Sequence, residues 1–101
     1  MAEHFNQLSP QEAEALAILG EECAEVGQVI GKIQRHGLFS RNPFDPQSLS
    51  NLDELKVELG DILAAIRVLQ KVGLLNESEL PPLRDAKLKK LPRFLHHIQL
   101  D

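Results

Sequence analysis

The 101-residue sequence predicts an all-α protein, and three observations support this fold class. Two long segments carry apolar residues at helical spacing, each begins with a capping signal, and no segment shows the alternation typical of a half-buried strand. Prolines and glycines separate these segments, as expected for loops. We therefore expect a helical bundle in which two long antiparallel helices are followed by one or two shorter C-terminal helices.

The first long helix is expected to begin after Ser9. Ser9, Pro10 and Glu12 occupy the N-cap, the first and the third helical positions of a capping box. The apolar pattern then runs from Leu16 to Ile33, and Gly37 is a suitable C-terminal stop.

The second long helix is expected from about Asn51 to Val72. Ser50 and Asp53 repeat the capping pattern at its start, and Gly73 follows its end. The polar sector of this helix is narrow, which predicts that neighbouring elements cover it on two sides.

The C-terminal quarter predicts one or two shorter helices over Leu83–Ile98, interrupted near Pro92. We interpret residues 1–101 as a single domain. A chain of this size buries a modest core, so oligomerisation is expected to complete the bundle.

Composition narrows the class of protein. There is no apolar run near 18 residues, which predicts that the chain has no membrane span. The N-terminus lacks the basic and apolar blocks of a signal peptide, and the lone Cys23 suits a reducing compartment, so a cytoplasmic protein is expected. Cys23 lies on the apolar arc of the first helix and is expected to be a small core residue. The net charge of −4 argues against nonspecific nucleic-acid binding.

Charge is distributed unevenly along the chain. Six acids and no lysine or arginine fall between Glu3 and Glu25, whereas five basic residues and one acid fall between Arg84 and Arg93. One interpretation is two solvated faces. The other is an acidic cation site and a basic anion site that act together.

Four carboxylates occupy unexpected positions on the two long helices. Glu22 falls inside the apolar arc of the first helix and Glu25 lies at its edge, while Asp61 falls among apolar residues of the second helix with Glu58 beside it. Each pair has i, i+3 spacing, which directs two side chains to one point on a helix flank. Antiparallel packing would bring all four carboxylates to a shared centre, where their burial needs a compensating cation.

The cation that fits these ligands is Mg²⁺, with Mn²⁺ as the other possibility, because oxygen ligands suit hard cations. A di-iron site is disfavoured, since those sites use Glu-x-x-His and no histidine stands at the required spacing. The alternative is that these acids pair with Arg67 or with the C-terminal cations.

The stretches EECAE, residues Glu21–Glu25, and ELGD, residues Glu58–Asp61, occur in this order within the two long helices. They resemble the EExxE and ExxD motifs of the MazG-like all-α nucleoside triphosphate pyrophosphohydrolases, whose relatives include dCTP pyrophosphatase and phosphoribosyl-ATP pyrophosphatase. The resemblance covers roughly Pro10–Leu75. It implies a homodimer or homotetramer that cleaves a nucleoside triphosphate between the α and β phosphates, giving a monophosphate and pyrophosphate.

The resemblance also implies roles for individual residues. The acids that match the family's metal ligands are Glu22, Glu25, Glu58 and Asp61. Glu21 would help to bind metal or orient water, so Glu21 and Glu22 are the expected catalytic residues. Basic residues on a later helix often hold the phosphates in this family. The candidates here, together with two alternatives at the end of the first helix, are Lys87, Lys89, Lys90, Arg93, Lys32 and Arg35.

The C-terminal segment departs from the family's Lys…Asn…Arg/Lys pattern, since no asparagine follows Lys87 and Pro92 interrupts the helix. Phe39 and Phe44 lie in the loop between the two acidic helices. They are candidates for stacking on a base, and the other interpretation is that they anchor the loop to the core.

Two further functions stay open from the sequence. One is a helical oligomerisation or partner-binding module that has the family fold but no activity, and on which Mg²⁺ has no effect. The other is hydrolysis of a non-nucleotide pyrophosphate, such as a phosphoribosyl compound.

Overall fold

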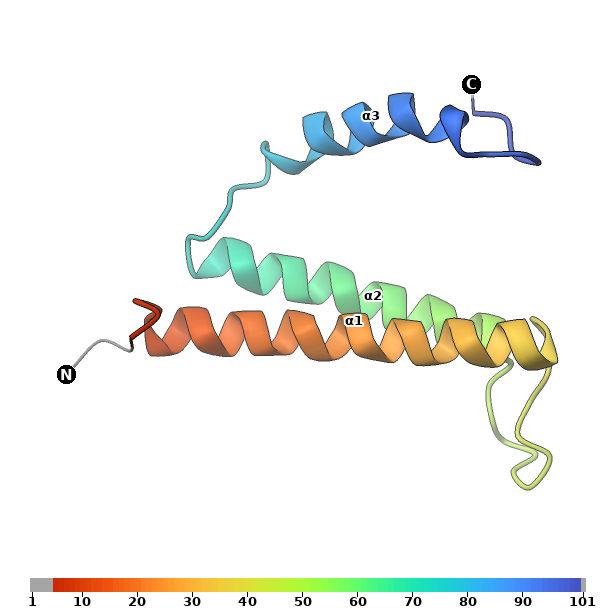
Figure 1. The fold of residues 1–101 in the computed structure, drawn as a ribbon. Helices are drawn as coiled ribbons and strands as arrows, with labels where there is room; N and C mark the ends of the chain where they lie inside the picture. Colours follow the sequence, from red (N-terminus) through yellow and green to blue (C-terminus); the bar gives the residue numbers. More distant parts are fainter. Residues whose placement is uncertain (1–4, 101) are drawn as a thin grey trace.

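The computed structural model describes residues 5–100, which form three α-helices and one short 3₁₀ helix and no strand. Helix α1 spans Pro10–His36, α2 spans Asn51–Lys71 and α3 spans Leu80–Lys90; the 3₁₀ helix spans Leu91–Arg93. Helices α1 and α2 lie side by side and antiparallel, and α3 lies apart from both of them (Figure 1). The all-α prediction is confirmed for this part of the chain.

Helix α1 has the predicted ends. The backbone N–H of Glu12 donates to Ser9 Oγ at 3.0 Å, and the backbone N–H of Ser9 donates to Glu12 Oε1 at 2.8 Å, which completes the capping box. Gly37 ends the helix with a φ of 91°, in the left-handed region that favours glycine, and its N–H donates to the carbonyl of Ile33.

Helix α2 also begins where the sequence predicts. Ser50 is its N-cap and accepts a hydrogen bond from the N–H of Asp53 at 3.1 Å. The loop returns to this start through two backbone bonds, from Asn51 to Ser40 and from Leu52 to Leu38. The loop therefore fixes how α1 and α2 are aligned.

The predicted C-terminal helices differ from the structure at both ends. Helix α3 starts at Leu80 instead of Leu83, because Pro81 and Pro82 fall in its first turn, where a missing N–H breaks no intrahelical bond. Helical structure stops at Arg93, just after Pro92, and residues 94–100 are not helical. The helix predicted to reach Ile98 is therefore too long.

Among the helices of residues 5–100, packing between elements distant in sequence is confined to the α1–α2 interface. Helix α3 contacts the 3₁₀ helix that follows it but neither α1 nor α2. The radius of gyration is 17.6 Å, whereas a compact domain of this length has about 13 Å. Among residues 5–100, the buried apolar side chains are Ala15, Val29, Ala65 and Leu69.

Two packing predictions are wrong for the single chain. Cys23 is exposed, because α1 turns that face away from α2. Among the helices of residues 5–100, α1 is the one that contacts α2, and Leu63 on another flank of α2 is 69% exposed. Both errors have the same cause, namely that no other helix of residues 5–100 packs against the outer faces of this helix pair.

Within residues 5–100, no helix has both the length and the apolarity needed to cross a membrane.

Candidate metal centre

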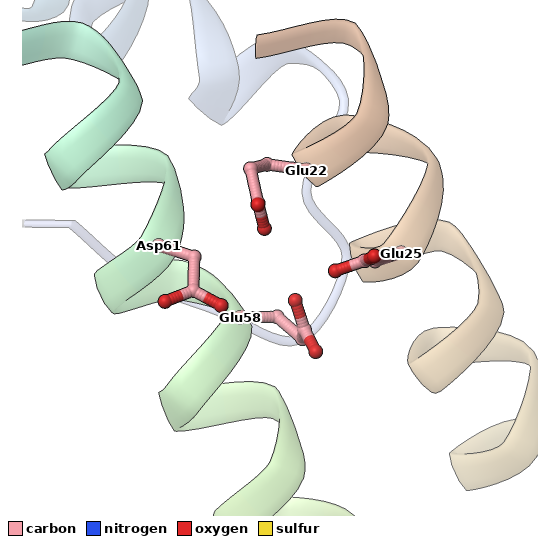
Figure 2. A group of neighbouring side chains, drawn as sticks. All are labelled: Glu22, Glu25, Glu58 and Asp61. Atoms are coloured by element: carbon pink, nitrogen blue, oxygen red, sulfur yellow. The ribbon is translucent and has the colours of Figure 1, made fainter. Parts of the chain in front are cut away.

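The four carboxylates predicted to converge do lie together between α1 and α2. Glu22 and Glu25 extend from α1, Glu58 and Asp61 extend from α2, and the side chains point toward one another (Figure 2). Each contributes one carboxylate oxygen to a group in which all four atoms lie within 4.8 Å of one another. We call these residues the carboxylate cluster.

Helical periodicity explains why the acids face each other. Ala15, Glu22 and Val29 are seven residues apart and share one face of α1, and the first and last of them are buried against α2. On α2, Glu58 and the buried Ala65 are likewise seven residues apart. The cluster therefore occupies positions of the α1–α2 interface that apolar side chains fill elsewhere.

The cluster has no compensating charge within the described residues. The ion pairs of this part of the chain are Lys32–Glu54, Lys56–Asp53 and Arg84–Asp85, and none includes a cluster member. Arg67, the alternative partner expected from the sequence, donates to Gln70 at 3.1 Å instead.

Two oxygens of the cluster are buried without a donor. Glu22 Oε2 and Glu58 Oε2 have no hydrogen-bond partner in the described part of the chain. A buried carboxylate oxygen that accepts nothing is unfavourable, and a cation between the helices would satisfy both.

Two acids of the cluster, Glu22 and Glu58, have raised pKa values. Partial burial is the largest cause for Glu22, whose pKa is raised further by the charges of Glu25 and Asp61. The pKa of Glu58 rises to about 7, chiefly because hydrogen bonding with the Glu25 side chain favours a shared proton, and also through burial and the neighbouring charges. The raised pKa of Glu58 means that a divalent cation at the cluster would compete with a proton on this group.

Glu21 lies outside the cluster. It is exposed, and it is not among the side chains whose oxygens converge. Its role as a water-orienting residue therefore stays a prediction.

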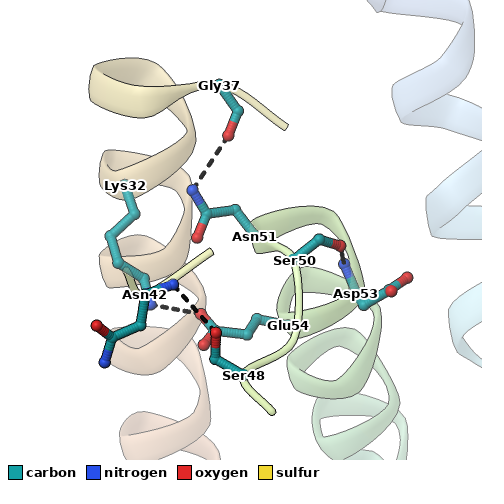
Figure 3. Close-up of polar contacts among 8 residues, drawn as sticks. All are labelled: Lys32, Gly37, Asn42, Ser48, Ser50, Asn51, Asp53 and Glu54. Carbon is teal, nitrogen blue, oxygen red and sulfur yellow. Dashed lines mark hydrogen bonds and ion pairs between the residues drawn. The ribbon is translucent and has the colours of Figure 1, made fainter. Parts of the chain in front are cut away.

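A second polar group continues the same interface toward the loop. Lys32 Nζ forms an ion pair and hydrogen bond with Glu54 Oε2, and the Asn51 side-chain amide donates to the carbonyl of Gly37 at 3.1 Å (Figure 3). Lys32 follows Glu25 by two helical turns and Glu54 precedes Glu58 by about one turn, so the four residues follow one line along the interface.

Sequence reasoning did not assign Glu54 or Asn51 to the site. The signal that identifies them is the spacing of α2, where Asn51, Glu54 and Glu58 share one helical face at intervals of three and four residues.

The other predicted phosphate contacts are not brought to the cluster by the single chain. Lys87 and Lys90 lie on α3 and Arg93 on the 3₁₀ helix, neither of which contacts α1 or α2. Arg35 is exposed in the last turn of α1. Of the predicted cations, Lys32 is the one that lies beside the cluster.

The two loop phenylalanines are exposed. Phe39 is 74% exposed and Phe44 is 93% exposed, so the interpretation that they anchor the loop to a core is wrong for this fold. Their stacking on a base stays a prediction.

Comparison with protein-family profiles, with curated proteins and with solved structures finds no match to this chain. The resemblance to MazG-like enzymes therefore rests on the EECAE and ELGD motifs and stays a prediction.

Proposed function

We propose that this protein is a Mg²⁺-dependent nucleotide pyrophosphohydrolase. It would cleave a nucleoside triphosphate between the α and β phosphates and release a monophosphate and pyrophosphate. The observation that carries the proposal is the convergence of four carboxylates within 4.8 Å, two of them with buried oxygens that no donor reaches. This arrangement is costly without a cation and suits one or more hard divalent cations.

In this proposal Glu22, Glu25, Glu58 and Asp61 hold Mg²⁺, or Mn²⁺ in its place. The bound metal would supply charge neutralisation for the phosphates and lower the pKa of a water. Lys32, beside the cluster and 41% exposed, would release Glu54 to bind a phosphate oxygen. Glu21, exposed next to Glu22, would accept a hydrogen bond from the attacking water.

The reaction class is supported by the order of the two acidic motifs, which resembles that of the MazG-like enzymes. No covalent intermediate is needed, because a metal-activated water can attack the phosphate directly. Lys32 lies at the loop end of the cluster, where its positive charge would attract a negatively charged phosphate.

Assembly into a homodimer or homotetramer is part of the proposal. Leu16 and Ile30 are each 42% exposed and lie on the same α1 face as the exposed Cys23, at seven-residue spacing. Leu59 and Leu63 form a second exposed apolar pair on α2. Surfaces of this kind are typical of subunit interfaces, and sedimentation at micromolar concentration is expected to give a dimer or tetramer; a monomer would contradict this part of the proposal.

The experiment that tests the function measures products from ribo- and deoxyribonucleoside triphosphates with Mg²⁺ and with EDTA. We expect pyrophosphate and a monophosphate from at least one nucleotide, in Mg²⁺ only. Orthophosphate as the sole phosphate product would contradict cleavage between the α and β phosphates. No product, together with a melting temperature that Mg²⁺ leaves unchanged, would favour a partner-binding module instead.

A further inference from the structure

A pocket lies where the end of α1, the α1–α2 loop and the start of α2 meet. Its volume is about 790 Å³, within the range of small-molecule sites. The side chains that matter here are those of His36, Ser40, Arg41, Leu49 and Asn51. We call this space the loop pocket.

The loop pocket adjoins the carboxylate cluster. A smaller pocket of about 390 Å³ is lined by Glu25 and Glu58 of the cluster, and it shares Lys32, Leu49 and Glu54 with the loop pocket. The Lys32–Glu54 ion pair therefore stands at the boundary between the two spaces (Figure 3).

In the opposite direction along the interface, the buried residues are apolar. Beyond Glu22 and Asp61 lie Ala15 and Ala65, each 1% exposed, and the buried Leu69, none of which offers a side-chain hydrogen bond or charge to a ligand. The polar lining and the two adjoining pockets therefore favour a ligand that extends from the cluster toward the loop.

Length and chemistry both suit the nucleoside part of a nucleotide. Seven residues separate Glu25 from Lys32, about 10 Å of helix, and a sugar and base extend over a similar distance from the α-phosphate. The pocket offers the apolar Leu49 beside hydrogen-bonding groups of Ser40, Arg41 and Asn51. An apolar wall with a few placed polar groups is typical of sites that bind a base and a sugar.

The loop is held in place by its own hydrogen bonds, which keeps the pocket open. Arg41 Nη1 donates to the Ser48 carbonyl at 2.8 Å, and the N–H of Asn42 donates to Ser48 Oγ at 3.1 Å. The side chain of Asn51, 6% exposed, holds the floor of the pocket to the end of α1. Ser40 donates nothing from its hydroxyl within the described residues, so that group is free to contact a ligand.

We propose that the loop pocket binds the nucleoside end of the substrate whose phosphates lie at the carboxylate cluster. This rests on the proposed function, and it makes the α1–α2 loop, not the C-terminal segment, the part of the chain that selects the base and sugar.

The test compares two probes by calorimetry in Mg²⁺: inorganic tripolyphosphate, and α,β-methylene analogues of the common nucleoside triphosphates, which resist cleavage. The wild type is expected to bind at least one analogue about tenfold more tightly than tripolyphosphate, the effect of one or two good contacts. Ser40→Leu, which fills the pocket, is expected to abolish this preference and leave the tripolyphosphate affinity unchanged.

Two further variants keep the test decisive. Gln47→Leu introduces the same side chain in the same loop but outside the pocket lining, and it should retain the preference. His36→Gln is a milder change at the pocket wall, and it should reduce analogue affinity several-fold. This variant supplies the test if Ser40→Leu does not fold.

The outcomes separate the two proposals. If tripolyphosphate binds and the preference for the analogue survives in both Ser40→Leu and His36→Gln, the loop pocket is not the nucleoside site, and the metal-dependent phosphate site is retained. If the analogue binds no more tightly than tripolyphosphate to the wild type, the loop pocket proposal is likewise overturned. If neither probe binds to the wild type in Mg²⁺, the proposed function itself fails and the loop pocket assignment fails with it.

Discussion

Two parts of the α1–α2 interface contain charged residues, and they treat charge in opposite ways. Near the loop, Lys32 and Glu54 form a neutral pair with a matched donor and acceptor. Two turns along α1, the carboxylate cluster brings four acids together without a cation from the described residues. The chain does place a cation in this interface, at Lys32, so a lack of basic residues there does not explain why the cluster is unpaired.

This difference indicates what each part depends on. Lys32 and Glu54 neutralise each other within the chain, so mutation of either partner removes a favourable interaction. If the cluster binds a cation as proposed, mutation of one acid relieves repulsion without metal and removes a ligand with metal. Comparing the two ends by mutation is thus a direct test of the cation site.

The largest expected effect is on catalysis. Asp61→Asn and Glu22→Gln each remove one charged ligand of the proposed metal site. We expect pyrophosphate release to fall by about 10³-fold, because a weakly held metal would no longer neutralise the phosphate charge. Asp53→Asn and Glu14→Gln make the same chemical changes on the same helices outside the cluster and should keep most of the activity.

Circular dichroism is the control for this comparison, and all four variants should keep the wild-type helix content. Normal turnover by Asp61→Asn or by Glu22→Gln would show that the cluster is not the metal site.

The next largest effect is expected in thermal melts, where the difference in melting temperature between Glu58→Gln and the wild type should change sign when metal is added. Without metal, Glu58→Gln should melt at or above the wild-type temperature, because it removes one of four mutually repelling acids. With Mn²⁺ at about 100 times its Kd, the wild type should gain about 10 °C through mass action, and the variant should gain far less. The same order of stability in EDTA and in Mn²⁺ would contradict a cation site at the cluster.

A smaller effect is the pH dependence of the metal-free protein. The pKa of Glu58 is about 7 in the fold against an ordinary 4.5, and that of Glu22 is raised as well. The folded state therefore binds more protons than the unfolded state between about pH 4.5 and 7, and stability should fall as pH rises through this window and level off above it.

Denaturant melts in EDTA between pH 5.5 and 8 measure this slope, and the difference between the wild type and Glu58→Gln isolates it from other titrating groups. The pKa of Glu12 is lowered by hydrogen bonds with Ser9, so Glu12 titrates below this range. A wild-type slope that Glu58→Gln leaves unchanged would show that the acids of the cluster do not share protons as described.

The sequence predicted the two long helices well because their signals are local. Ser9, Glu12 and Ser50 form caps with residues three positions away, and Gly37 adopts the conformation that favours glycine. The convergence of the acids followed from helical spacing together with antiparallel packing, which needs little more than the two helices themselves.

Features that depend on distant elements were predicted poorly. The faces of Cys23 and Leu63 were expected to be covered, but coverage depends on where α3 packs, and α3 contacts neither long helix. The Lys32–Glu54 pair was missed because it depends on the alignment of α1 with α2, which is set by loop contacts such as that between Asn51 and Gly37. The start of α3 was misplaced because prolines were interpreted as helix breakers when they occupy the first turn.

The smallest effect is expected from mutating the Lys32–Glu54 pair, which should change stability slightly and independently of metal. Lys32 is 41% exposed and Glu54 is 32% exposed, so water screens their attraction and the pair should contribute about 0.2–1 kcal/mol. Lys32→Met should therefore destabilise the protein slightly, equally in EDTA and in Mn²⁺, whereas Glu58→Gln should respond to the metal. A double-mutant cycle with Glu54→Gln measures the coupling between Lys32 and Glu54 directly, because the double variant leaves no unpaired charge. If Lys32→Met instead changed stability in Mn²⁺ only, Lys32 would belong to the charge balance of the cluster, and the division of the interface into a neutral end and a cation-dependent end would be wrong.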